Sequence, residues 1–267
     1  MKLIKRLITG TILFSLILVA IYQGNIFFNL IIFAISLLNL YEINKIKGSL
    51  DLSFTNIFIL SLYSIIFATL FIPFFEPFWE SIWLQLLFLV VILFTVYEFF
   101  KNKYFFIKHK YFSHVHSLLL ITVGFPFLIL IRNLENGLFI CLFIFFIVTT
   151  ADSIAYFIGK FFGRHHISEI SPKKTWEGSF AGLLSSIIVS IIFSLLYSQF
   201  EFLTILIFGL FISIIAQYGD FYESLIKRSY SVKDSSKLLP GHGGFLDRTD
   251  SYLFLFPLVY YFHRYFL

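Results

Sequence analysis

Long apolar stretches separated by short polar gaps make up most of this chain. Each stretch approaches the roughly 20 residues that a helix needs to cross the hydrocarbon core of a bilayer. An open strand would leave its backbone groups unsatisfied in lipid, so helices are expected. The pattern therefore predicts an all-α, polytopic membrane protein with about nine transmembrane helices, at residues 4–22, 25–43, 55–75, 80–100, 113–131, 137–158, 179–198, 202–222 and 251–267.

The first apolar stretch has features of a signal peptide. It follows the basic segment Met1-Lys-Leu-Ile-Lys-Arg6 and stays apolar as far as Tyr22. However, no small-x-small cleavage site comes after it, and the next apolar stretch begins at about Asn25. We therefore expect this stretch to be retained as the first helix.

The distribution of Lys and Arg among the connections predicts the orientation of these helices. When the nine stretches alternate across a bilayer, all 20 Lys and Arg residues except Arg132 and Arg264 fall on one side. Connections on the cytoplasmic side carry such an excess of cations. The N-terminus is therefore expected in the cytoplasm, in the inner (cytoplasmic) membrane of the cell, and the C-terminus outside.

The polar connections differ between the two halves of the chain, which we treat as a single membrane domain (1–267). Connections within residues 1–135 are short and carry little beyond these charges. Two long connections, 159–178 and 223–250, are dense in Gly, Lys, Asp, Ser and His. Residues 136–267 are therefore predicted to supply the catalytic helices and cytoplasmic loops.

The composition agrees with a membrane protein and argues against other classes. Apolar residues make up 59% of the chain and charged residues 13%, against about 25% charged in soluble domains. The net charge of +5 does not indicate a nucleic-acid partner, because the cations lie in short gaps and form no basic stripe. Cys141 is the only cysteine, so neither a disulfide framework nor a paired-thiol metal site can form.

Two polar clusters come first among the candidates for chemistry. Asp152-Ser153 interrupts an apolar stretch, where an ionised carboxylate costs at least about 2.5 kcal/mol; it either faces a cavity or partner, or marks a solvated helix end. Lys173 and Lys174 follow Pro172 in the connection 159–178. These adjacent cations suit a polyphosphate or an anionic lipid headgroup, although they serve equally well as topology signals. Trp176, close by, is typical of an interfacial anchor.

The third cluster begins at the end of the eighth predicted helix. Asp220, Ser224 and Lys227 are spaced four and three residues apart, so they lie on one helix face. Glu223 and Arg228 flank that face. A carboxylate and a cation therefore share one stripe.

The same cluster continues through a glycine-rich turn that leads toward the last predicted helix. Backbone N–H groups in such a turn can approach phosphate oxygens closely. Neighbouring Asp side chains offer the oxygen ligands that Mg²⁺ takes, usually with water and substrate phosphate. His242 within the turn is either a phosphate donor or a turn residue. The segments are Lys233-Asp234, Leu239-Pro-Gly-His-Gly-Gly244 and Asp247-Arg-Thr-Asp250.

Structural roles remain open for the acidic residues of this cluster. Asp250-Ser251 could simply cap the final helix at its N-terminus. Asp220 and Asp247 could form ion pairs with Lys227 or Arg248. A structural pair alone would not need a surrounding glycine loop, so we favour a functional role for both aspartates.

These residues carry a resemblance to a known family. Ser224-x-Ile-Lys-Arg228, Lys233-Asp234, Ser236, Leu239-Pro240 and His242-Gly-Gly-Phe-x-Asp-Arg-Thr-Asp250 resemble the signature of the phosphatidate cytidylyltransferase (CDP-diacylglycerol synthase) family. The stretch from Asp152 to Gly178 is similar to the preceding block of that family. The resemblance covers roughly 40 to 45% of the chain, at its C-terminal end. Lys160 in place of the common Arg, and Ser235-Ser236 in place of the common Phe-Gly, are departures in loop detail.

The resemblance implies transfer of CMP from CTP to phosphatidate with Mg²⁺, on the cytoplasmic side of the membrane. Asp220 and Asp247 would bind the metal ion. The implied catalytic residues are Asp220, Asp247, Lys227, Lys233 and Arg248. The implied substrate-binding residues are Asp152, Lys173, Lys174, Ser224, Arg228, Asp234, His242, Gly243, Gly244 and Asp250.

Two rival functions stay open beside this one. A CTP-dependent kinase acting on a polyprenol or another lipid alcohol would use a related site but would transfer the γ-phosphoryl group. An ion-coupled transporter would use Asp152 and Asp220 as its pathway and would not consume CTP. A CDP-alcohol phosphotransferase is disfavoured because its Asp-Gly-x-x-Ala-Arg motif is missing. The sequence leaves a homodimer open.

Overall fold

The computed structural model describes residues 2–46, 110–168, 171–197, 200–241 and 243–266, with short pieces between 61 and 97. The regular elements among these residues are helices, and no strand occurs in the described part of the chain. Two isolated bridges, His166 with Thr175 and Leu239 with Gly243, are the only extended pairings found there. The predicted helices at 55–75 and 80–100 lie largely outside the described residues.

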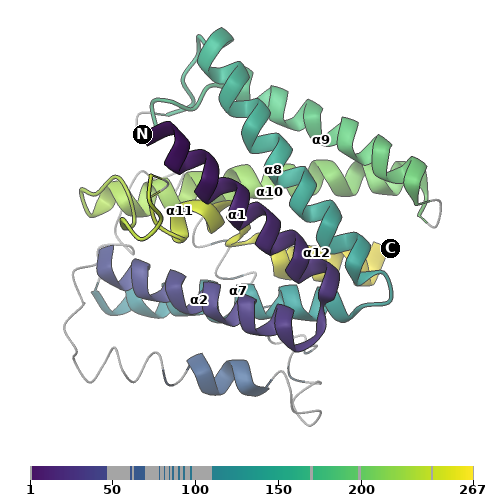
Figure 1. Ribbon diagram of the computed structural model, residues 1–267, viewed down its shortest axis with the longest axis horizontal. Helices are drawn as coiled ribbons and strands as arrows, with labels where there is room; N and C mark the ends of the chain where they lie inside the picture. The colour runs from purple at the N-terminus through teal and green to yellow at the C-terminus, as the bar shows by residue number, and fades with distance from the viewer. Residues whose placement is uncertain are drawn as a thin grey trace. The chain divides into compact units, whose positions relative to one another are not determined.

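Figure 1 shows the described helices in chain order from purple to yellow. Two of them, α11 and the 3-10 helix η3, are short and lie just before the last helix. The bounds are α1 (Lys2–Gln23), α2 (Asn25–Ile46), α7 (Lys110–Asn133), α8 (Gly137–Phe162), α9 (Trp176–Leu196), α10 (Phe202–Ser229), α11 (Leu246–Thr249), η3 (Asp250–Tyr252) and α12 (Leu255–Phe266).

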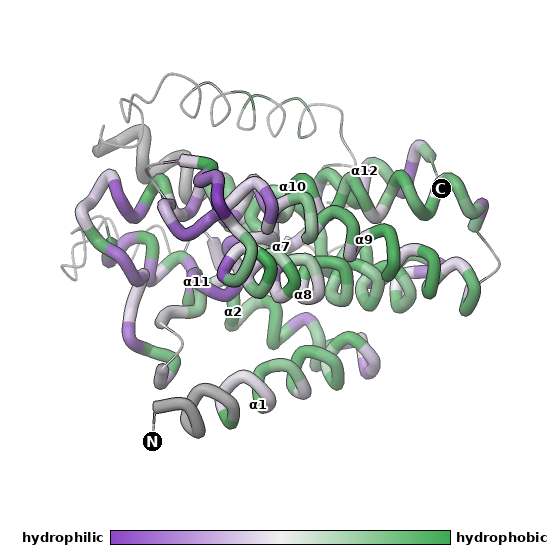
Figure 2. The backbone as a smooth tube through the Cα atoms, turned by 90° about the horizontal axis from the view of Figure 1, so that it is seen from above, coloured by the Kyte–Doolittle hydropathy of each residue, from purple (hydrophilic) through white to green (hydrophobic). Residues whose placement is uncertain are grey.

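Four of the described helices, α2, α8, α9 and α10, are long and apolar enough to cross a membrane. Hydrophobic residues run along much of α9 and α12 in Figure 2. Many of the large apolar side chains on α9 are exposed, among them Leu184, Ile188 and Leu195. An exposed apolar helix face is stable in lipid and costly in water, so the helical membrane class predicted from the sequence is confirmed.

The described chain forms two compact units, each built from two separate segments. Unit 1 combines Met1–Ile129 with Ile226–Thr249, and unit 2 combines Leu130–Leu225 with Asp250–Leu267. Unit 1 therefore combines N-terminal residues with a later segment, whereas unit 2 comes from the middle and the end of the chain. Helix α10 contributes its first part to unit 2 and its last turn to unit 1.

In unit 2, α8 and α9 pack closely because small residues face each other where the helices meet. A Cβ atom on Gly178 would lie 2.6 Å from the carbonyl oxygen of Ala155, and one on Gly182 would lie 3.1 Å from that of Ala151. Thr175 caps α9, since its side chain accepts a hydrogen bond from the N–H of Gly178 at 3.2 Å. The cap explains why α9 begins at Trp176 and not at residue 179 as predicted.

Replacing Gly178 with Ala is therefore expected to destabilise unit 2. Alanine favours a helix over glycine by up to about 1 kcal/mol, but overpacking against a fixed carbonyl costs about 1–3 kcal/mol. The overpacking cost exceeds the gain in helix propensity, so the melting temperature of the purified protein should fall. Ile188→Ala, on the exposed face of the same helix, is the matched control. An unchanged melting temperature for Gly178→Ala would contradict the close packing.

In unit 1, the polar residues of α2 lie on one buried face. Ser36, Asn39 and Glu42 are three residues apart, and each is 0% exposed. The Ser36 hydroxyl forms a hydrogen bond with the hydroxyl of Tyr63, and α2 contacts α11 near its other end. A polar stripe buried along an otherwise apolar helix indicates that α2 packs against other polar protein groups there.

The last helix differs from the prediction. A single span at 251–267 was expected, whereas α12 covers only Leu255–Phe266 and follows the short elements α11 and η3. Twelve residues are fewer than a helix needs to cross a bilayer. Asp250 begins η3 and does not cap α12, so the simple capping role that the sequence left open for Asp250-Ser251 is wrong.

Candidate active site

The predicted site residues fall into two groups, one in each compact unit. Unit 2 holds Asp152, Lys173, Lys174, Asp220, Ser224 and Asp250. Unit 1 holds Lys227, Arg228, Lys233, Asp234, Gly243, Gly244, Asp247 and Arg248. His242 lies outside the described residues. Each group is described in turn.

A cluster of four carboxylates forms the group in unit 2. Asp152 comes from α8, Asp220 and Glu223 from α10, and Asp250 from η3. Burial raises the pKa of Asp250 well above its usual value, and the negative charges of Asp220, Glu223 and Asp152 raise it further. Asp250 is therefore close enough to the other three carboxylates for their charges to oppose its ionisation. Glu223, which the sequence analysis placed at the margin of the site, is 0% exposed.

The backbone brings η3 against α10 through a glycine. A Cβ atom on Gly219 would lie 2.6 Å from the carbonyl oxygen of Asp250. Glycine is thus required beside Asp220 because η3 approaches the helix so closely. On the α8 side, the Ser251 hydroxyl donates to Asp152 at 3.1 Å. These contacts bring α8, α10 and η3 together at one group of acidic side chains.

Lys174 is the cation of this cluster. Its ammonium lies 2.7 Å from Asp220 Oδ2 and 5.5 Å from the centre of the Phe221 ring. A short hairpin holds it there: the Lys174 carbonyl accepts from the Ile167 N–H, and the Trp176 N–H donates to His165. Lys173 next to it is exposed to solvent. The two adjacent cations therefore have different roles, since one balances the carboxylates and the other faces outward.

The hairpin is fastened at its base by a charged contact. His165 Nδ1 lies 2.6 Å from Glu177 Oε1, and the His165 N–H also donates to that carboxylate. The N–H of Glu177 itself, the His165 ring and nearby backbone groups lower the pKa of Glu177 to about 2. Glu177 is thus ionised at neutral pH, beside the first turn of α9, where a negative charge is favoured.

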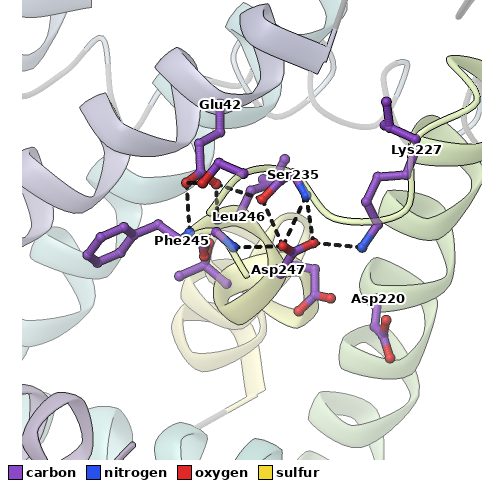
Figure 3. Close-up of polar contacts among 12 residues, drawn as sticks. Glu42, Asp220, Lys227, Ser235, Phe245, Leu246 and Asp247 are labelled. Atoms are coloured by element: carbon purple, nitrogen blue, oxygen red, sulfur yellow. Dashed lines mark hydrogen bonds and ion pairs between the residues drawn. The ribbon is translucent and has the colours of Figure 1, made fainter. Parts of the chain in front are cut away.

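Asp247 is the centre of the group in unit 1 (Figure 3). Its carboxylate lies 2.8 Å from the Lys227 ammonium and accepts from the Ser235 N–H, the Ser235 hydroxyl and the Gly244 N–H. Burial alone would raise the pKa of Asp247, but these donors and the Lys227 charge outweigh it and hold the pKa below its usual value. The pairing with Lys227 is the one that the sequence left open as a structural alternative.

A second carboxylate in unit 1, Glu42 from α2, escaped the sequence analysis. It accepts four hydrogen bonds, from the hydroxyls of Ser235 and Ser236 and from the N–H groups of Phe245 and Leu246. The only signal in the sequence was a carboxylate near the end of an apolar stretch. The partners of Glu42 could not be predicted, since they lie about 200 residues away along the chain.

The other predicted residues of unit 1 surround these two carboxylates. Lys233, Asp234 and Arg248 are exposed. Arg228 is also exposed, and its guanidinium donates to the Val232 carbonyl at 3.1 Å. Gly243 has a positive φ of 87°, which glycine adopts without strain. The exposed cations border a turn whose N–H groups from Gly244 to Leu246 are bound to protein carboxylates.

The acidic side chains suit a metal ion that keeps its own water. Among the described residues, no group of three or more His, Cys, Asp or Glu side chains forms a ready cage for a metal. Mg²⁺ does not need such a cage, because it usually takes one or two carboxylates together with water and substrate phosphate. In unit 2, the charges of Asp152, Asp220 and Glu223 oppose the ionisation of Asp250, and a cation bound there would offset that repulsion. Asp220 and Asp247 belong to different units, so their sharing of one ion stays a prediction.

Comparison with known proteins gives a consistent result. The Cytidylyltransferase family profile matches residues 4–266. A phosphatidate cytidylyltransferase of Bacillus subtilis is 33% identical over 264 residues, which cover 96% of each chain. One from Synechocystis is 47% identical over 133 residues, which cover 49% of this chain and 45% of that protein. Phosphatidate cytidylyltransferase 5, chloroplastic, of Arabidopsis thaliana is 46% identical over 130 residues, which cover 48% of this chain and 32% of the plant protein.

Proposed function

This chain belongs to the cytidylyltransferase family, and on that premise we propose that it transfers CMP from CTP to phosphatidate, giving CDP-diacylglycerol and pyrophosphate. The observation that carries the proposal is the similarity to the Bacillus subtilis phosphatidate cytidylyltransferase, which extends over 96% of both chains. The signature residues between Ser224 and Asp250 support the same reaction.

A membrane location suits this pair of substrates. Diacyl chains stay in lipid, whereas CTP is dissolved in the cytoplasm. The four apolar helices support insertion in the bilayer. The bias of Lys and Arg supports a cytoplasmic N-terminus, in the inner membrane, with the site on the cytoplasmic side. The substrates would then meet at the inner leaflet.

The reaction asks for charge neutralisation more than for proton transfer. A phosphate monoester has a second pKa near 6, so the phosphatidate oxygen is already largely anionic at neutral pH. That oxygen forms a bond to the α-phosphorus of CTP while the bond from this phosphorus to the bridging oxygen breaks, and pyrophosphate leaves with the bonding electrons. Holding two polyanions in line is the main task of the protein. A site of Asp, Lys and Gly fits this task.

The exposed cations of unit 1 are placed to contact phosphates. Lys233 and Arg248 are exposed and flank the two tethered ends of the loop that contains the glycine-rich turn. Because Gly244, Phe245 and Leu246 donate their N–H groups to Asp247 and Glu42, phosphate contacts would fall to these side chains and to the earlier part of the turn. Lys173 in unit 2 would add a further cation.

We propose Asp220 as a Mg²⁺ ligand, with Asp152 and Asp250 as further ligands or orienting groups. Mg²⁺ would neutralise charge on the triphosphate and on the leaving pyrophosphate. Asp247 remains the second proposed ligand. In this structure its carboxylate already accepts hydrogen bonds from Lys227, Ser235 and Gly244. Lys174 would hold Asp220 in place through their ion pair.

Labelled CTP tests the proposed function directly. Purified protein in lipid-containing micelles would be given phosphatidate, Mg²⁺ and CTP labelled at either the α- or the γ-phosphate. We expect the α-label in the lipid product and the γ-label in pyrophosphate. Transfer of the γ-label to lipid would instead support a lipid kinase, and ion-driven uptake without CTP consumption would support a transporter.

A further inference from the structure

Glu42 holds both ends of one loop through a single carboxylate (Figure 3). Oε1 accepts from the Ser236 hydroxyl at 2.6 Å and the Phe245 N–H at 2.9 Å. Oε2 accepts from the Ser235 hydroxyl at 2.8 Å and the Leu246 N–H at 2.8 Å. Each oxygen therefore bonds to one hydroxyl from the start of the loop and one backbone amide from its end.

We infer that Glu42 is a positioning residue that fixes the loop of residues 235–246, so that α2 supports turnover through this loop. The inference rests on the proposed function for its effect on turnover. It concerns a residue outside the C-terminal signature and gives one N-terminal helix a defined role.

The burial of Glu42 shows that its contacts are specific. The side chain is 0% exposed, and a carboxyl group is stable at such a place only when hydrogen-bond partners satisfy both oxygens. Its four donors are all neutral groups. The four hydrogen bonds therefore depend on the geometry of the loop, and loosening the loop would leave buried oxygens of Glu42 without these donors.

The contact between Glu42 and Ser235 leaves no room for a side chain at Gly244. A Cβ atom at this position would clash with the Glu42 carboxylate and with the Ser235 hydroxyl. Its own N–H donates to Asp247 at 2.8 Å. Glycine is thus required here because the Glu42 carboxylate and the Ser235 hydroxyl fill the space that a Cβ atom would need, independently of any approach by phosphate.

Two further contacts join α2 to the segment around Asp247. Ser235 donates both to Glu42 and to Asp247, so the two carboxylates are bridged by one hydroxyl. One turn earlier on α2, Asn39 Oδ1 accepts from the Thr249 hydroxyl at 3.0 Å. Helix α2 therefore tethers the loop and also the end of α11.

The tether acts where precise placement matters. Lys233 and Asp234 immediately precede the first pair of donors, and Asp247 and Arg248 immediately follow the second pair. Displacing reacting groups by about 1 Å can lower a rate about 100-fold. Fixing both ends of the loop would hold the cations that contact phosphate at a constant spacing.

The test compares Glu42→Gln with Glu135→Gln, an exposed carboxylate-to-amide control. The new NH₂ group would face an N–H or hydroxyl donor, so one end of the loop should come free. We expect kcat to fall about 100-fold with a much smaller change in KM for CTP, because placement rather than uniform binding is lost. Kinetics of Glu42→Gln at the wild-type level would overturn the inference.

Limited proteolysis measures how often the loop opens, and it needs no substrate. Trypsin can cut after the exposed residues Lys233 and Lys237, and its rate follows the population of the opened loop. We expect cleavage there to be about tenfold faster in Glu42→Gln than in Glu135→Gln. Unchanged cleavage would contradict only the inference about Glu42. A wild-type protein that forms no CDP-diacylglycerol would instead contradict the proposed function.

A second variant keeps the test sharp if Glu42→Gln does not fold. Ser236→Ala removes one of the four donors and leaves both amides in place, so it should fold, raise loop cleavage modestly and lower kcat about threefold. In the double variant with Glu42→Gln the serine change should cost nothing more, since both act through one contact. If Ser236→Ala has no effect on cleavage or kcat, or if its effect is the same in both backgrounds, the inference fails.

Discussion

Replacing Asp220 with Asn is expected to lower turnover by at least about 1,000-fold while the protein stays folded in the membrane. The substitution removes a negative charge from the carboxylate cluster of unit 2 and the proposed ligand for Mg²⁺. Turnover is measured as pyrophosphate released from CTP in the presence of phosphatidate. The Mg²⁺ concentration needed for half-maximal rate should rise in any residual activity.

The stability of this variant separates chemistry from folding. The side chains of Lys174 and Asp220 are 25% and 31% exposed, and such partly exposed ion pairs contribute only about 0–1 kcal/mol. Losing the pair also relieves repulsion on Asp250. The melting temperature should therefore change little. Glu201→Gln, just before the other end of α10, is the matched control, and near-normal turnover in Asp220→Asn would remove Asp220 from the metal site.

The helices could be predicted from the sequence wherever apolar stretches end in polar turns. The starts of α8 and α10 were predicted at 137 and 202, where the structure has Gly137 and Phe202. The apolar pattern gave their ends too early, because both helices continue through charged residues such as Lys160 and Lys227. Lys and Arg are good helix formers, so a helix need not stop where its apolar stretch does.

The last helix was misplaced for a different reason. Leu253 and Phe254 are buried in the connection before α12, so they extended the apolar pattern beyond the helix. Pro257 was the missed signal, because proline is favoured in the first turn of a helix, where its missing N–H costs nothing. A start at Leu255 places Pro257 in that turn.

In the candidate site, residue types could be predicted but their partners could not. Spacing placed Asp220 and Lys227 on one helix face, yet the structure pairs Asp220 with Lys174 and Lys227 with Asp247. Each pair joins residues that a loop brings together. Glu42 shows the limit most clearly, since its four donors are set by tertiary packing and no local pattern encodes them.

Replacing Asp247 with Asn is expected to abolish turnover and also to destabilise unit 1, in contrast to Asp220→Asn. The side chains of Lys227 and Asp247 are only 12% and 9% exposed, and removing one partner of a buried pair costs about 3–5 kcal/mol. The new amide would also present an NH₂ group to the Ser235 and Gly244 donors. Thermal unfolding and pyrophosphate release measure the two effects separately.

The acid dependence of stability should change in the same variant. Because the folded pKa of Asp247 lies below its usual value, this group adds stability that is present above the unfolded pKa of about 3.9. That stability is lost as the pH falls through the lowered folded value. Asp247→Asn should lose this part of the pH dependence, which unfolding measured between neutral and acidic pH would show.

A double variant tests whether Asp247 is needed only to balance Lys227. Lys227→Met alone leaves Asp247 with its Ser235 and Gly244 donors, and Asp247→Asn with Lys227→Met removes both charges. Because replacing a whole buried pair with neutral groups is often tolerated, the double variant should regain stability relative to Asp247→Asn. Turnover should stay abolished if Asp247 binds the metal ion. Recovery of turnover together with stability would show that the carboxylate is needed only to balance Lys227.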